Sequence, residues 1–251
     1  MKLENPINFL PQSTQELLIN PTAKNIGETL GGISETFLSS INILTTLANV
    51  HIRKFKQSII DNVNKIPEEK RDPSKINLAI KTIEDSTYQI NDDNLREMFA
   101  KLVAASVDKR NNQDLSPKFS SILSQLSSSD AKLLKSLFFN PKLPIPTVSY
   151  AVYEGKGYFY PILDHFIGIN YSKENIIHNE AGLDNLTSLG IIKIKDNFEI
   201  SEVHLQKFYQ EMKHLDYPIK AIDKNKESDI KIINGIIEFT SLGKNFMNKV
   251  L

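Results

Sequence analysis

Histidine and carboxylate side chains are the groups in this sequence that could exchange protons near neutral pH. In two places the types stand together: Asp164 directly precedes His165, and Glu202 lies two residues before His204. The other histidines are scattered along the chain, at His51, His178 and His214. A lone histidine beside an acid is more often structural than catalytic, so we expect neither pair to carry out acid–base chemistry.

Other catalytic and ligand-binding motifs are missing from the sequence. There is no cysteine, which excludes disulfides, thiolate nucleophiles and Cys-ligated zinc. The glycine-rich nucleotide loops, the serine-nucleophile turn and the paired-histidine zinc helix do not occur either. We therefore predict a protein that is not an enzyme and that holds no cofactor or metal.

The charge balance excludes any bulk attraction to nucleic acid or anionic lipid, because 30 Lys and Arg residues face 30 Asp and Glu residues. The opening residues MKLENPINFLPQ, with Glu4, do not resemble a secretory signal. The longest uncharged run, Thr36 to Val50, is shorter than the roughly 20 apolar residues that a bilayer span needs. We expect a cytoplasmic protein.

Residues 22–140, after an N-terminal extension of residues 1–21, have the apolar period of helices and predict a helical bundle. The first row of apolar residues would form one face of a helix. This face would pack in the bundle or in a homo-oligomer, or, as an alternative function, residues 26–60 would contact a membrane surface. The residues of this face are Ile26, Leu30, Ile33, Phe37, Ile41 and Leu44. Further along the chain, Asp72 before Pro73, and either Asn91 or Asp92, are predicted to begin later helices.

Four short pieces of the helical region carry a resemblance to a known family. They are Ile66–Glu69, Asn94–Phe99, the Asp108–Pro117 turn with Phe119, and Gln125–Ala131. In this order and spacing, residues 66–135 resemble the abortive infection alpha family of bacterial phage-resistance proteins. The resemblance implies a role in limiting phage spread from an infected cell, and it implies no catalytic residue. The sequence departs from the family pattern at Ser116, where histidine is expected.

A charged surface within this region is a candidate for binding a phage or host protein. Its residues are Arg96, Glu97, Lys101 and Asp108. The alternative interpretation is an ordinary helix face with i,i+4 ion pairs, Asp92 with Arg96 and Glu97 with Lys101.

The C-terminal region loses the helical period. We interpret residues 141–172 as a linker with a hairpin through Glu154–Gly157. Residues 173–251 follow the order of a winged helix: a helix from Asn175 to Leu189, a strand after Gly190, a strand from Ile230 to Phe239 and a last helix. The predicted fold class is therefore mainly α, with an N-terminal helical bundle and a small α+β winged-helix-like domain.

A winged helix raises the alternative of a DNA-binding regulator. The helix that would read DNA contains Glu180 and Asp184 and has no Lys or Arg, so it could not neutralise phosphates. We do not expect nucleic acid to be the partner.

Overall fold

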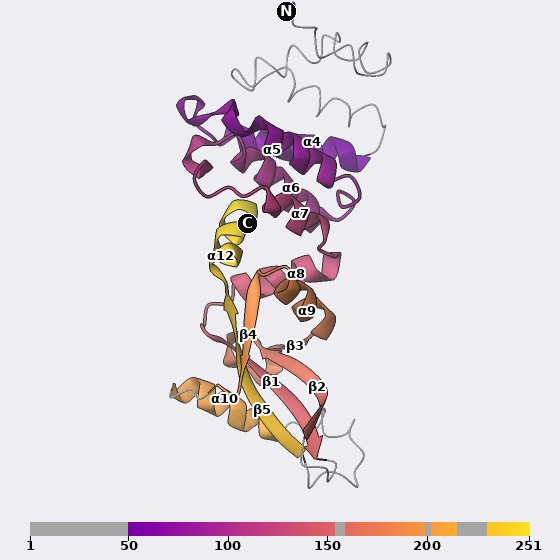
Figure 1. The fold of residues 1–251 in the computed structure, drawn as a ribbon, viewed down its shortest axis with the longest axis vertical. Coiled ribbons are helices and arrows are strands. Elements are labelled where there is room, and N and C mark those ends of the chain that lie inside the picture. Colours follow the sequence, from indigo (N-terminus) through magenta and orange to yellow (C-terminus); the bar gives the residue numbers. More distant parts are fainter. Residues whose placement is uncertain (1–49, 154–158, 199–201, 215–229) are drawn as a thin grey trace, which may run out of the picture. The chain divides into compact units, whose positions relative to one another are not determined.

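The computed structural model describes residues 50–153, 159–198, 202–214 and 230–251. The N-terminal extension, the face from Ile26 to Leu44 and the turn Glu154–Gly157 lie outside these residues. The chain divides into two compact units. The helical unit comprises the residues up to Ser128 together with Phe246–Leu251, and the sheet unit comprises Ser129–Asn245 (Figure 1).

The helical unit is built around α6, which contacts three other helices. Its elements are α4 (Val50–Asn64), η2 (Glu68–Lys70), η3 (Pro73–Lys75), α5 (Ile76–Asp85), α6 (Asp93–Ala105), η4 (Lys109–Asn111) and α7 (Lys118–Ser124), with the last residues of α12 (Ser241–Val250). Small residues such as Ala100 and Ala104 are buried on α6 and let its neighbours approach closely. Phe119 of α7 meets Phe246 of α12 edge to face, with ring centroids 5.5 Å apart.

The predicted helix starts are confirmed. The side chain of Asp92 accepts hydrogen bonds from the backbone N–H groups of Asn94 and Leu95 at the start of α6. Asp72 accepts from the N–H of Ser74, with Pro73 at the first position of η3. In both places the short acidic side chain satisfies amides that have no partner within their own helix.

The sheet unit contains a five-stranded antiparallel sheet in the order β3-β2-β1-β5-β4. Its elements are α8 (Ser128–Phe138), β1 (Ile145–Tyr153), β2 (Phe159–Gly168), η5 (Ile169–Tyr171), η6 (Lys173–Asn175), β3 (Ile176–His178), α9 (Glu180–Ser188), β4 (Ile192–Asp196), α10 (Val203–Lys213) and β5 (Ile230–Phe239). Helix α10 lies across one face of the sheet (Figure 1). There Leu205, Phe208 and Met212 pack on Val148 and Tyr150 of the central strand β1.

The predicted fold class was wrong, because the described residues form helices together with an extensive antiparallel sheet and not a mainly α protein with a winged helix. The supposed linker 141–172 contains β1 and β2, which pair with each other. Strand β5 pairs with β1 as well as β4, so the two strands assigned to a wing belong to this larger sheet. The alternative function of a DNA-binding regulator rested on the winged helix and therefore has no structural basis.

The chain that follows α9 lies against the segment that joins β5 to α12. The hydroxyl of Thr240 donates to the carbonyl of Gly190 over 2.6 Å and accepts from the N–H of Gly243 over 2.9 Å. Gly190 has a φ of 74°, the left-handed conformation that favours glycine after a helix. The predicted stop of α9 is therefore confirmed, and it is joined directly to the start of α12.

Candidate functional site

Two of the four residues predicted to form a partner surface are buried. Arg96 is 7% exposed and donates to the carbonyl of Ile90 over 3.1 Å and to Asp93 over 2.5 Å. Asp93 forms an ion pair with Arg96 from three residues earlier on the helix, and the carboxylate of Asp92 caps α6. Asp108 is 4% exposed. These side chains stabilise the helical unit and are not presented to a partner.

The other two predicted residues, Glu97 and Lys101, form hydrogen bonds within the helical unit. Glu97 accepts a hydrogen bond from the amide of Asn62 over 3.0 Å, which joins α6 to α4. Lys101 donates to the backbone carbonyl of Leu251. The four residues therefore do not form one exposed patch.

Two segments of the family-like region are held side by side in the helical unit, and we call them together the signature-loop surface (residues 66–75 and 107–112). The N–H of Asp72 donates to the carbonyl of Val107 over 2.9 Å. Arg71 and Asp108 form an antiparallel β-bridge. The amide of Asn112 donates to Asp72 over 2.6 Å. These bonds hold two loops in one arrangement although neither lies in a long helix.

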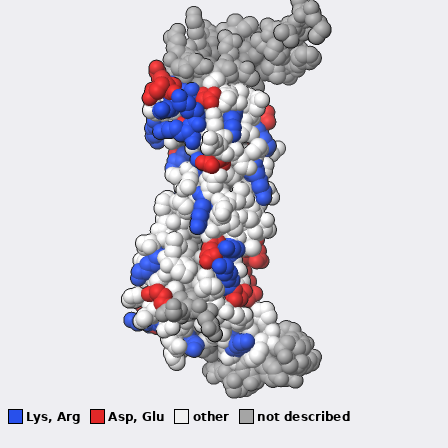
Figure 2. Space-filling model, turned by 60° about the vertical axis from the view of Figure 1, so that its left-hand side comes forward, with Lys and Arg blue, Asp and Glu red and all other residues white. Residues whose placement is uncertain are grey.

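Charges on the signature-loop surface differ in exposure. Glu68, Glu69 and Lys109 are exposed, whereas Asp108 is buried beneath Arg110. Burial opposes ionisation of Asp108, but hydrogen bonds from the side chain and N–H of Arg110 outweigh it and lower the pKa of the carboxyl. The view in Figure 2 shows Lys and Arg side chains gathered on the helical unit with acidic side chains beside them.

The predicted histidine–acid pairs are arranged differently in the structure. Nε2 of His165 lies 3.5 Å from Oδ1 of Asp196, on another strand. Glu202 caps α10 by accepting from the N–H of Leu205 over 2.8 Å, while His204 lines a pocket. Among the described residues no three His, Asp or Glu side chains are placed to hold a metal ion.

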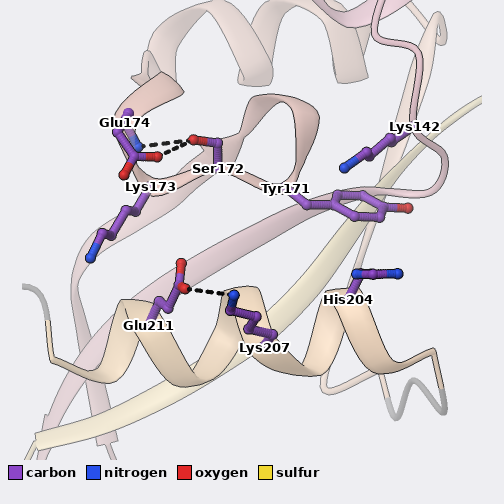
Figure 3. A pocket seen from close by; sticks show the side chains of 8 residues that line it. All are labelled: Lys142, Tyr171, Ser172, Lys173, Glu174, His204, Lys207 and Glu211. Atoms are coloured by element: carbon purple, nitrogen blue, oxygen red, sulfur yellow. Dashed lines mark hydrogen bonds and ion pairs between the residues drawn. The ribbon is translucent and has the colours of Figure 1, made fainter.

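The sheet unit carries an open cavity of about 340 Å³, which we call the Tyr171 pocket. Figure 3 shows its lining, which comes from the segment before β1, the η5–η6 segment and α10. The residues are Lys142, Tyr171, Ser172, Lys173, Glu174, His204, Lys207 and Glu211. The Nζ of Lys142 lies 5.3 Å from the centroid of the Tyr171 ring, close enough for a cation–π interaction.

A buried asparagine positions two sides of the Tyr171 pocket. Asn140, 6% exposed, donates through Nδ2 to the carbonyl of Lys142 over 2.6 Å and accepts through Oδ1 from the N–H of Asn170 over 3.0 Å. Asn170 and Tyr171 both have left-handed backbone, with φ of 62° and 59°. Such a conformation is rare for a bulky side chain and costs on the order of 1–3 kcal/mol. The surrounding contacts therefore keep the backbone of Tyr171 in an unfavourable conformation, in which its ring lines the pocket.

Both signs of charge line the Tyr171 pocket, but the acids have partners. Ser172 donates to the carboxylate of Glu174, and this bond lowers the pKa of Glu174. Glu211 lies 3.9 Å from Nζ of Lys207. Burial, with a contribution from Glu202, raises the pKa of Tyr171. The Tyr171 pocket was not predicted, because its residues lie in a segment interpreted as a linker, at the start of the next segment and in the unpredicted helix α10.

The fold and these sites define a mixed α and β protein of two compact units, with an ordered loop surface on one and a charged pocket on the other. The model of a family described as abortive infection alpha matches residues 48–250, and the chain belongs to this family. It is thus a protein of the abortive-infection type, a class associated with phage resistance. No curated protein and no solved structure matches the chain.

Proposed function

We propose that this protein defends a bacterium against phage without catalysing a reaction, by binding a phage or host protein through the signature-loop surface. The observation that carries the proposal is the hydrogen-bonded junction of residues 66–75 with 107–112. Two loops far apart in the sequence present Glu68, Glu69 and Lys109 at one place. A partner that meets ordered loops loses less conformational freedom on binding than one that must first order them.

The charge pattern of the signature-loop surface supports a protein partner over nucleic acid. Exposed acids lie next to exposed bases on these loops, and carboxylates would repel a phosphate backbone. Complementary charges on a protein can match both signs and suppress wrong partners.

Membrane contact by residues 26–60 stays a prediction, because most of that segment lies outside the described residues. Among the described residues no helix combines the length and apolar character needed to cross a membrane.

A phage-challenge experiment tests the proposal. The triple variant Glu68→Lys, Glu69→Lys, Lys109→Glu reverses three exposed charges and leaves Asp72, Asp108, Arg110 and Asn112 unchanged. The control variant Lys118→Glu, Lys132→Glu changes exposed charges outside these loops. We expect the wild type and the control to lower the yield of sensitive phages and to capture the same protein from infected cells, and the triple variant to do neither.

Two outcomes would contradict the proposal. Unchanged phage yield with the wild type, across a diverse panel, would remove the defence role. Full protection and the same captured protein with the triple variant would remove the signature-loop surface as the docking site. Matching thermal melting curves for all three proteins would exclude misfolding as the cause of a lost effect.

A further inference from the structure

We propose that the Tyr171 pocket binds the phosphate group of a small ligand. This inference does not depend on the proposed function, because it concerns a different site in the sheet unit. Three lysines, Lys142, Lys173 and Lys207, line the cavity from three separate segments of the chain. His204 adds an imidazole that can donate a hydrogen bond to an oxygen.

The geometry favours phosphate over carboxylate. In Figure 3 Lys142 and Lys207 lie on different sides of the pocket, with His204 beside Tyr171, whereas the side chain of Lys173 points away from them. A phosphate monoester presents three terminal oxygens in different directions, whereas a carboxylate presents two in one plane. Donors that approach from several sides therefore match the tetrahedral group better. The cavity, about 340 Å³, is at the lower end of the size of small-molecule sites.

The three lysines of the pocket outnumber its two carboxylates, Glu174 and Glu211, and each carboxylate already has a partner. Glu174 already accepts from the hydroxyl of Ser172. Lys207 precedes Glu211 by four residues on α10 and is 3.9 Å away, in the weaker of the two orders for a helical ion pair. A ligand oxyanion can therefore replace this long contact at little cost.

The hydrogen bonds and backbone conformations around the pocket are typical of a binding site. Asn140 fixes the backbone on both sides of the Lys142–Tyr171 contact. The left-handed backbone at Asn170 and Tyr171 is a local strain of the kind that clusters at binding sites. Together these features hold one cation in place before a ligand arrives, which reduces the entropy lost on binding.

Titration of the full chain with inorganic phosphate and methyl phosphate, followed by amide NMR shifts, tests the inference. We expect saturable shifts at residues 170–174 and at the start of α10. Lys142→Gln and Lys207→Gln should each weaken binding by about tenfold, the usual loss for a hydrogen bond to a charged group. Lys213→Gln, an exposed lysine on the same helix outside the pocket, should leave the affinity unchanged.

Three results would overturn the inference. One is no saturation by either phosphate at concentrations up to about 10 mM. Another is binding that the Lys142→Gln, Lys207→Gln double variant leaves unchanged. The third is equal or tighter binding of acetate or a tetraglutamate peptide, which would assign the pocket to carboxylates instead. Unchanged melting temperatures of the variants would show that a lost affinity comes from the pocket itself.

Discussion

The side-chain amide of Asn112 donates a hydrogen bond to Oδ2 of Asp72 over 2.6 Å, across a sequence separation of 40 residues. The same carboxylate accepts from the N–H and the hydroxyl of Ser74, and these bonds together with the one from Asn112 lower the pKa of Asp72. One acidic group thus begins a helical turn and ties it to a distant loop.

Removing the amide of Asn112 should loosen the signature-loop surface. We expect Asn112→Ala to lower the free energy of unfolding by about 1 kcal/mol, the usual net contribution of one hydrogen bond. Gln113→Ala, at the exposed neighbouring position, is the matched control and should change it by less than about 0.5 kcal/mol. Urea denaturation at pH 7 measures both. Equal stability of the two variants would show that the bond does not hold the loops together.

The buried carboxylate of Asp108 should make stability depend on pH. Its pKa is lowered in the folded protein, so its contribution is complete above the unfolded pKa of about 3.9 and is lost as the pH falls through the folded pKa. We expect Asp108→Asn to be less stable than the wild type by about 1 kcal/mol at pH 7, a small value because Arg110 is half exposed.

The difference between wild type and Asp108→Asn should shrink steadily as the pH is lowered below about 4. Chemical denaturation at a series of pH values follows it. A difference that stayed constant down to pH 2 would mean that the ionised carboxylate contributes nothing.

Gly243 permits the close approach of α12 to the chain after Gly190. A Cβ at this position would lie 2.0 Å from the backbone oxygen of Ile191, and backbone cannot move aside as a flexible side chain can. We expect Gly243→Ala to destabilise the protein by about 3 kcal/mol, visible as a lower thermal unfolding temperature. Lys244→Ala, one residue further on and exposed, should stay close to wild type. Similar melting of both variants would contradict the close approach.

The helices of the helical unit were predictable because their apolar residues repeat with helical period and their starts carry acidic caps. Strand β1 was expected only as one arm of a short hairpin within a linker and not as the central strand of a sheet, because the buried polar residues Thr147 and Ser149 and the nearby prolines hid its apolar pattern. The sequence of helix α10, by contrast, does have the apolar spacing that predicts a helix. Leu205, Phe208, Tyr209 and Met212 follow the i, i+3, i+4, i+7 spacing of an amphipathic helix and are all buried.

The candidate sites could not be predicted from spacing because they depend on long-range contacts. Nothing local indicates that Asn112 pairs with Asp72, or that Asn140 binds Asn170, 30 residues away. The charges of Arg96 and Asp108 appeared accessible on a helical pattern, whereas tertiary packing buries them. Sequence patterns indicate which face of an element is apolar, but they do not show which polar side chains the fold encloses.

The assignment of Phe246–Leu251 to the helical unit has a consequence for how a ribosome makes this protein. Phe246 packs on Phe119, and Lys249 donates to Asn111 over 2.7 Å. Every strand of the sheet is translated between the two parts of the helical unit. A nascent chain therefore carries an unfinished helical core until residues 246–251 emerge, and premature termination anywhere in the sheet leaves Phe119 without the ring of Phe246.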